Sequence, residues 1–193
     1  MKVLSLARSR RSVRAYSRDP VPMQDLRYVL EAACNAPSGA NRQPWRFLVI
    51  RDPRRKKLIR EACEEAEKRF HEKADPEFKR WLEEKGISWK KPFLTDAPVL
   101  LLVFGKTDEP YWIESIWIAV GYMLLAAEEL GYSTLTYTPS ETGWANELLN
   151  IPENYSLQAI IPLGRSAEQA KPKERYGVEE ISYLEEWGRK LSP

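Results

Sequence analysis

The sequence predicts one α+β or three-layer α/β domain spanning residues 1–193. The length is enough for a single hydrophobic core, and the hydrophobic content of 43% is ordinary for a globular protein. Segments with helical spacing of apolar residues alternate along the chain with apolar runs of strand length. Since these patterns are mixed and no internal repeat appears, we expect one layered domain.

The elements follow from periodicity and from turn residues. Proline and glycine interrupt the chain between them, and Asp52-Pro53 signals the start of a long helix. Strands are predicted at 45–50, 98–105, 133–138 and 155–162, and helices at 1–8, 22–36, from about 54 to past 70, 113–130 and 141–149. The charged segment at 68–93 predicts a mobile lid, or simply a charged helical excursion.

Two segments indicate a subunit interface. The helix at 113–130 is apolar all round until Glu128, so it is buried either centrally or against another subunit. The polar tail at 170–193 ends in an amphipathic stretch with Trp187 on its apolar face. Such a tail needs a surface to lie on, and a partner subunit would provide one.

Composition limits the functional classes. The net charge of +2 gives no support for a nucleic-acid binder. The single histidine, His71, argues against a zinc site or a Ser-His-Asp triad, and the absence of G-x-G-x-x-G disfavours a Rossmann domain. No apolar run approaches the ~20 residues of a membrane span. Cys34 and Cys63 form no disulfide framework, which fits a reducing, cytoplasmic setting.

A basic segment near the start contains Arg10, Arg11, Ser12 and Arg14. Guanidinium groups and a hydroxyl in one short loop suit a phosphate dianion, because arginine offers permanently charged, bidentate donors. Arg175 would supply a further cation from the far end of the chain. Taken alone, this acid-free stretch also fits a solvated basic segment or an organellar transit peptide.

Two further segments bring hydrogen-bonding groups to turns. Residues 36–45 contain Ser38, Asn41 and Gln43 between proline and glycine, which suits recognition of a polar heterocycle but also a plain helix-to-strand turn. Residues 134–139 contain three threonines at a predicted strand end. These threonines would present hydroxyls to a ligand, or reflect β-propensity alone.

Together these segments resemble the nitroreductase-like family of FMN flavoproteins. The matching motifs are R-R-S-x-R at 10–14, A-P-S-x-x-N-x-Q-P-W at 36–45, and P-L-G at 162–164 followed by Arg175. They occur in the family's order and cover most of the chain. Because the family uses the basic segment in its mature site, the resemblance removes the transit-peptide interpretation.

The resemblance implies a mixed central sheet flanked by helices, in an interlocked homodimer that exchanges the long helix and the tail. One FMN would lie in each of two interfacial sites. The implied cofactor-binding residues are Arg10, Arg11, Ser12, Arg14 and Arg175 at the phosphate and polar side of the flavin, Pro37, Ser38 and Asn41 in the loop from the other subunit, and Thr136, Tyr137 and Thr138 against the isoalloxazine.

The closest resemblance is to the iodotyrosine deiodinase branch, through residues 36–40, 96–98 and 136–139. That branch removes halide from halotyrosines and clamps the amino-acid zwitterion with a Glu, a Tyr and a Lys. Glu67 falls at the Glu and Lys91 at the Lys, and their charges suit the substrate ammonium and carboxylate. Without the resemblance, Glu67 is most simply a solvated charge on an acidic helix.

Three other positions take implied roles from the same branch. Ala40 is implied as a substrate contact. His71 stands at the clamp tyrosine position, and this departure leaves open whether the substrate is a halotyrosine. Thr138 falls where the branch places a hydroxyl near the redox-active flavin nitrogen, so it is the implied catalytic residue.

The predicted function is therefore FMN-dependent reduction of a small aromatic acceptor, with reductive dehalogenation of halotyrosine-like substrates as one form. The alternatives are an NAD(P)H-dependent nitro or quinone reductase, a non-catalytic flavin-binding protein, and a scaffold whose basic loop binds another phosphate. The electron donor is left open, with NAD(P)H as one candidate.

Overall fold

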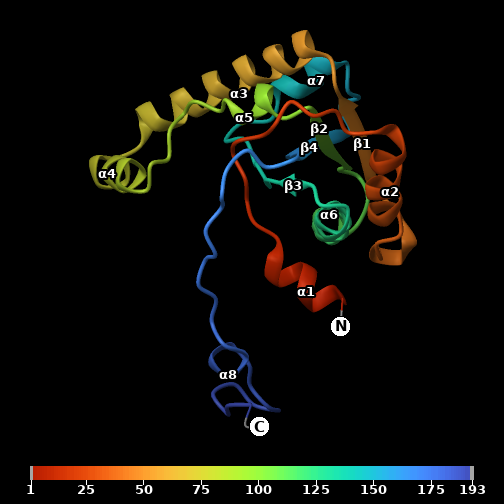
Figure 1. The fold of residues 1–193 in the computed structure, drawn as a ribbon, viewed down its shortest axis with the longest axis vertical. Helices are drawn as coiled ribbons and strands as arrows, with labels where there is room; N and C mark the ends of the chain where they lie inside the picture. The colour runs from red at the N-terminus through yellow and green to blue at the C-terminus, as the bar shows by residue number, and fades with distance from the viewer. Residues whose placement is uncertain (1, 192–193) are drawn as a thin grey trace.

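A four-stranded sheet lies at the centre of the computed structural model, which describes residues 2–191 (Figure 1). The strands in spatial order are β1 (Trp45–Ile50), β2 (Val99–Lys106), β4 (Tyr155–Gly164) and β3 (Ser133–Thr134), and each ladder is antiparallel. An isolated parallel bridge joins Ser12 to Thr134, so the sheet is mixed at its β3 edge. The predicted helix start at Met1 and tail end at 192–193 lie outside the described residues.

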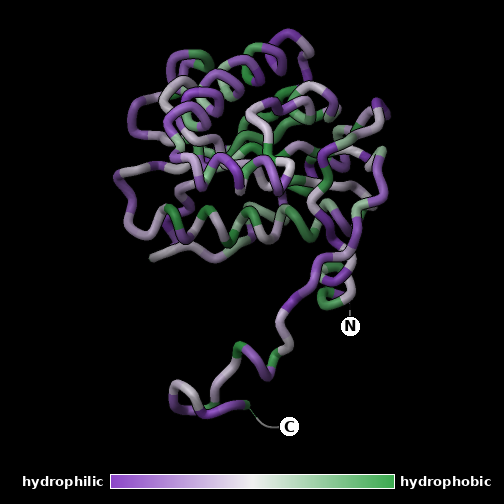
Figure 2. The backbone as a smooth tube through the Cα atoms, turned by 90° about the vertical axis from the view of Figure 1, so that its left-hand side faces the viewer, coloured by the Kyte–Doolittle hydropathy of each residue, from purple (hydrophilic) through white to green (hydrophobic). Residues whose placement is uncertain are grey.

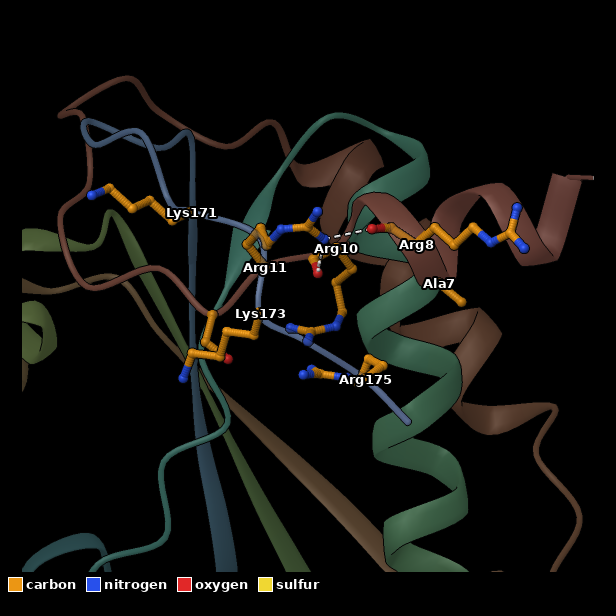
Figure 3. Close-up of a pocket in the computed structure, with 8 residues that line it drawn as sticks. Ala7, Arg8, Arg10, Arg11, Lys171, Lys173 and Arg175 are labelled. Atoms are coloured by element: carbon orange, nitrogen blue, oxygen red, sulfur yellow. Dashed lines mark hydrogen bonds between the residues drawn. The ribbon is translucent and has the colours of Figure 1, made fainter. Parts of the chain in front are cut away.

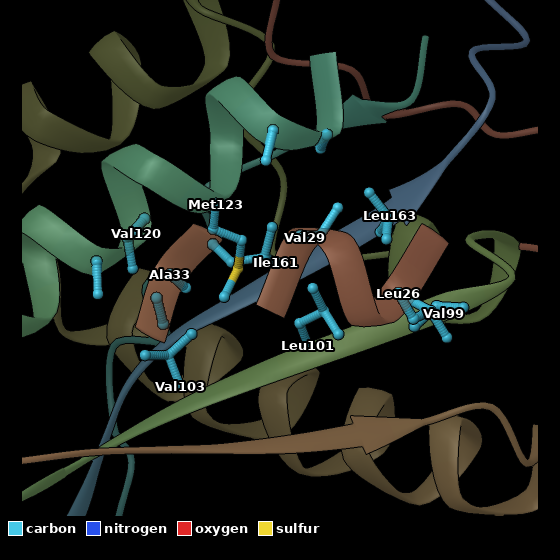
Figure 4. Packing of buried hydrophobic residues seen from close by; sticks show 14 of the residues in the cluster. Leu26, Val29, Ala33, Val99, Leu101, Val103, Val120, Met123, Ile161 and Leu163 are labelled. Atoms are coloured by element: carbon cyan, nitrogen blue, oxygen red, sulfur yellow. The ribbon is translucent and has the colours of Figure 1, made fainter. Parts of the chain in front are cut away.

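Helices cover both faces of this sheet. One face carries α2 (Met23–Cys34) and α6 (Trp112–Glu129), and the other carries α3 (Pro53–Lys73), α5 (Phe93–Asp96) and α7 (Trp144–Leu149). Strand β2 alternates between the two layers: Leu101 packs towards α2 and α6, and Leu102 towards α3, α5 and α7. Figure 4 shows the first of these layers, where Val29 and Met123 meet the sheet. The predicted α+β fold is confirmed.

The charged region at 68–93 divides into helix and loop. Helix α3 continues to Lys73, and α4 (Pro76–Glu84) follows after a break and projects away from the sheet (Figure 1). Asp75 caps α4 by accepting a hydrogen bond from the backbone N–H of Phe78 at 2.9 Å, and Pro76 occupies the first helical position. An irregular segment then leads to α5.

The strand predicted at 133–138 was too long. Strand β3 ends at Thr134, and the chain returns to the sheet only at Tyr137, which forms an isolated bridge with Ile160 of β4. Leu135 and Thr136 line a cavity instead of pairing with β4. Threonine-rich sequence favours extended backbone, but hydrogen bonding to a neighbour decides where a strand ends.

The tail leaves the body of the molecule (Figures 1 and 2). It contains one helical turn, α8 (Val178–Ile181), and the side chain of Trp187 is 91% exposed. The apolar helix α6 also has an uncovered face, where Ile113, Trp117, Ile118 and Tyr122 are exposed. A single copy therefore leaves apolar surface on both segments open to water. None of the described helices is long and apolar enough to cross a membrane.

Candidate active site

A basic pocket of about 300 Å³ lies where α1 (Lys2–Ser9) meets the start of the tail (Figure 3). Six of its eight lining residues are basic and none is acidic; the lining is Ala7, Arg8, Arg10, Arg11, Ser12, Lys171, Lys173 and Arg175. The predicted meeting of the 10–12 segment with Arg175 is thus present. A pocket with this concentration of positive charge suits an anion with more than one negative charge.

The backbone around the basic segment is fixed by contacts with distant residues. The N–H of Val13 donates to the carbonyl of Thr134 at 3.0 Å, and the N–H of Ala15 donates to the Glu168 carboxylate at 3.3 Å. Some of the hydrogen-bonding capacity of Arg11 is already used within the chain, since its guanidinium donates to the carbonyls of Ser9 at 2.9 Å and Arg10 at 3.0 Å. Arg11 therefore supports the turn after α1 as well as lining the pocket.

A second cavity, of about 670 Å³, adjoins the basic pocket. It lies between the loop that follows α4 and the chain after β3; its lining includes Arg14, Trp81, Lys85, Gly86, Ile87, Ser88, Lys90, Lys91, Pro92, Phe93, Leu135, Thr136, Tyr137 and Lys173. Lys173 lines both cavities, so they are neighbours. This volume is typical of a small-molecule site, and we call it the cleft.

Lys91 and Tyr137 line the cleft, and Glu67, which lines neither cavity, lies behind them in an ion pair with Lys91. Glu67 Oε2 is 3.3 Å from Lys91 Nζ, and each residue is only 7% exposed. Two groups donate to the other carboxylate oxygen, Oε1: the hydroxyl of Tyr137 at 3.0 Å and the backbone N–H of Ser140 at 3.1 Å. The Lys91 ammonium also donates to the carbonyl of Ser88 at 2.7 Å. The structure therefore brings together Glu67 and Lys91, the two residues expected to clamp a substrate zwitterion.

Burial affects the titration of the groups beside this pair. Burial raises the pKa of the Tyr137 hydroxyl, and the nearby Cys63 and Glu67 act in the same direction. Burial also raises the pKa of the Cys63 thiol to about 12. Tyr137 is consequently a protonated hydrogen-bond donor to Glu67 at neutral pH.

Several predicted residues stand apart from these cavities in the described chain. Pro37, Ser38, Ala40 and Asn41 line neither cavity. Their loop is ordered around the 3-10 turn η1 (Gly39–Asn41): Ser38 Oγ accepts from the N–H of Gln43 at 3.0 Å, and the N–H of Gly39 donates to Ser115 Oγ of α6 at 3.2 Å. This loop therefore packs against α6 and not against either cavity.

Thr138 and His71 also line neither cavity. Thr138 is exposed, whereas His71 is half-buried on α3, one turn beyond Glu67. The Nε2 atom of His71 is buried and has no hydrogen-bond partner among the described residues.

Sequence reasoning did not identify Ser140, Lys171 and Lys173 as site residues. The two lysines flank Pro172 and precede Arg175, so this cluster of positive charge in the sequence could have indicated an anion-binding site. Ser140 acts through its backbone N–H, for which sequence carries no signal.

Comparison with known proteins places these features in a family. The Nitroreductase family matches residues 7–165. The iodotyrosine deiodinase of Thermotoga neapolitana is 44% identical over 182 residues, which cover 94% of this chain and 96% of that protein. A crystal structure of oxidized iodotyrosine deiodinase bound to FMN and 3-iodo-L-tyrosine superposes with a TM-score of 0.85 at 42% identity, covering 95% of this chain and 98% of that chain.

A more distant solved structure, a nitroreductase with bound FMN from Bacteroides fragilis, has a TM-score of 0.75 at 28% identity and covers 96% of this chain and 100% of that chain. The similarity thus extends over nearly the whole chain in sequence and in fold. The chain belongs to the Nitroreductase family.

Proposed function

We propose that this protein is an FMN-dependent oxidoreductase that removes halide reductively from halotyrosines. The single observation that supports this most strongly is the buried ion pair between Glu67 and Lys91, of which Lys91 lines the cleft. Relatives and solved structures named as iodotyrosine deiodinases support the same activity.

The two adjoining cavities fit FMN. Arg10, Ser12 and Arg175 bring guanidinium and hydroxyl donors to a pocket without acids, which suits a phosphate monoester. The cleft beside it is lined by Thr136 and Tyr137 and has room for a planar ring. FMN, when bound, supplies the redox chemistry, and the protein contributes position and electrostatics.

The substrate zwitterion would exchange partners with the buried ion pair. Its ammonium would take the place of Lys91 beside Glu67 Oε2, and its carboxylate would take the place of Glu67 beside Lys91. Each buried charge then keeps a partner of opposite sign, which a neutral ligand cannot provide. We infer that His71 adds a third contact through its unpartnered Nε2, and that Ala40 reaches the substrate from a second subunit.

The overall reaction replaces the halogen on the aromatic ring by hydrogen. The aryl carbon–halogen bond breaks, halide leaves as an anion, and the ring carbon gains one proton and two electrons. An external two-electron donor of the reduced nicotinamide class would supply the electrons, and FMN, when bound, would be the redox group beside the ring. The protein holds the ring in place for this transfer, and the hydroxyl of Thr138 would donate to the redox-active flavin nitrogen.

We infer that the active form is a homodimer. The exposed apolar faces of α6 and the tail support it, as does the position of Pro37, Ser38 and Asn41 away from the cavities of their own chain. In this arrangement residues 1–193 form one domain, 68–93 close over the substrate as a lid, and 170–193 wrap the partner. The two free thiols support a reducing, cytoplasmic setting.

The test is turnover of 3-iodotyrosine by the FMN-loaded protein under anaerobic conditions, with a chemical reductant or reduced nicotinamide as the donor. We expect one iodide and one tyrosine per two electrons consumed. Reduction of nitroaromatics or quinones without iodide release would instead assign the protein as a general NAD(P)H-dependent reductase. Bound FMN without turnover of any acceptor would leave a flavin-binding protein.

A further inference from the structure

Tyr137 belongs to the cofactor segment, residues 136–138, which is expected to contact the flavin, and its hydroxyl also reaches the clamp residue Glu67. Its backbone is fixed to β4, since its N–H donates to the carbonyl of Ile160 at 3.1 Å and its carbonyl accepts from the N–H of Ile160 at 2.8 Å. Its ring meets the edge of Phe93 with centroids 5.4 Å apart, and the residue is only 8% exposed. Both the backbone and the ring of Tyr137 are therefore held in place.

The two carboxylate oxygens of Glu67 have different partners, and the hydroxyl of Tyr137 is one of them. Oε1 accepts from this hydroxyl at 3.0 Å and from the N–H of Ser140 at 3.1 Å. Oε2 faces Lys91, whose Nζ lies 3.3 Å away. Because both neutral donors act on Oε1, the carboxylate is locked in rotation and Oε2 is presented to a cation.

Helix α3 alone would not produce this geometry. A glutamate side chain on a helix has several accessible rotamers, and fixing one of them costs conformational entropy. Tyr137 and Ser140 come from the chain after β3, about seventy residues away in sequence, and they supply the hydrogen bonds that select one rotamer. The two neighbours of Tyr137, Thr136 and Thr138, belong to the expected flavin contact.

We propose that Tyr137 is a positioning residue: its phenol orients Glu67 so that Oε2 meets the substrate ammonium. Because Tyr137 is also part of the cofactor segment, it links the orientation of Glu67 to that segment. The proposal rests on the proposed function and adds a role to Tyr137 beyond flavin contact. Since the raised pKa of the phenol keeps it protonated, it acts as a donor over the whole physiological pH range.

The experiment compares Tyr137→Phe with Tyr132→Phe in the FMN-loaded protein. Tyr132 is a matched control because it is also buried and also donates to a carboxylate, Asp25 Oδ2, at 2.6 Å, but lines neither cavity. Flavin fluorescence reports the Kd of 3-iodotyrosine and of its deaminated analogue, which keeps the iodophenol and the carboxylate but lacks the ammonium. The Kd of FMN is measured for each variant.

We expect Tyr137→Phe to weaken 3-iodotyrosine binding about tenfold, because Glu67 loses a hydrogen bond to its charged form. The Kd of the deaminated analogue and that of FMN should change less than twofold, and Tyr132→Phe should bind 3-iodotyrosine like the unmodified protein. An equal loss for both ligands, or for FMN, would show a merely structural role and overturn the proposal.

Two outcomes separate this proposal from the proposed function. If the unmodified protein binds 3-iodotyrosine and Tyr137→Phe binds it equally well, the positioning role is wrong and the dehalogenase assignment stands. If the unmodified protein binds FMN but not 3-iodotyrosine, both are wrong.

Discussion

Glu67 and Lys91 form an ion pair of 3.3 Å just behind the lining of the cleft, although they are 24 positions apart in the sequence and both are almost fully buried. Burying two charges is costly unless each gains several partners. Here Glu67 gains the Tyr137 hydroxyl and the Ser140 N–H, and Lys91 gains the Ser88 carbonyl. A buried ion pair beside a cavity suits a receptor for a zwitterion, because each charge can exchange its partner for a ligand group of the same sign.

Arg175→Gln should weaken FMN binding about tenfold, which corresponds to the loss of one charge-assisted contact. The Arg175 guanidinium donates to the neighbouring Glu174 carbonyl at 2.9 Å, which leaves most of its donors for a ligand. Arg18→Gln is the control, because Arg18 lines neither cavity. Isothermal titration at two salt concentrations measures both variants, and an unchanged Kd for Arg175→Gln would remove Arg175 from the phosphate site.

Ile118→Asp should convert the protein from dimer to monomer. Ile118 is 41% exposed on the apolar face of α6, and a charge placed in an apolar interface is strongly disfavoured. Leu58→Asp, on α3, adds the same charge at a comparably exposed site and should leave the dimer intact. Sedimentation velocity at micromolar concentration is the measurement. A monomeric unmodified protein, or an Ile118→Asp variant that still dimerises, would contradict the interface.

Cys34 should react with iodoacetamide at pH 8, and Cys63 should not. Cys34 is exposed, whereas burial excludes reagent from Cys63 and raises its thiol pKa to about 12. A raised pKa means less of the reactive thiolate, about one part in ten thousand at pH 8. Peptide mass spectrometry of native and unfolded protein distinguishes the two sites. Rapid labelling of native Cys63 would show that α3 opens away from Tyr137.

His71→Phe should weaken 3-iodotyrosine binding roughly three- to tenfold, the effect of one hydrogen bond. The buried Nε2 of His71 has no partner among residues 2–191, and it lies on the same helix as Glu67. Flavin fluorescence gives the Kd, and the Kd of FMN should stay the same. An unaltered Kd for 3-iodotyrosine would mean that the imidazole does not replace the clamp phenol.

Much of the fold could be predicted because its signals are local. Trp45–Ile50 was predicted with the observed bounds, since its apolar and aromatic residues lie between a proline and a helix-starting Asp-Pro pair. The end of β3 could not be predicted, because pairing with β4 decides it. The same distinction applies to the site. The meeting of the 10–12 segment with Arg175 was expected from motifs, whereas the contact of Tyr137 with Glu67 depends on tertiary packing.

The burial of Glu67 shows most clearly what periodicity cannot supply. Its helix is rich in charge, and most of its acids are solvated, as the surface pair of Lys57 with Glu61 illustrates. The chain after β3 and Lys91, both folded against this one turn, distinguish Glu67 from its neighbours. Resemblance to a family pointed to Glu67, and hydrophobic pattern alone would not have done so.

The most direct test of the clamp is titration of the FMN-loaded protein with 3-iodotyrosine, monitored by flavin fluorescence. The proteins compared are the unmodified protein and the variants Glu67→Gln, Lys91→Gln and Lys57→Gln. We predict saturable quenching that Glu67→Gln and Lys91→Gln each weaken by about 10- to 100-fold, since each removes a charged hydrogen-bonding partner of the zwitterion. Lys57→Gln, an exposed control on the same helix, should behave like the unmodified protein. Absence of quenching with FMN still bound, or quenching that neither clamp variant weakens, would contradict the assignment of Glu67 and Lys91 to the substrate.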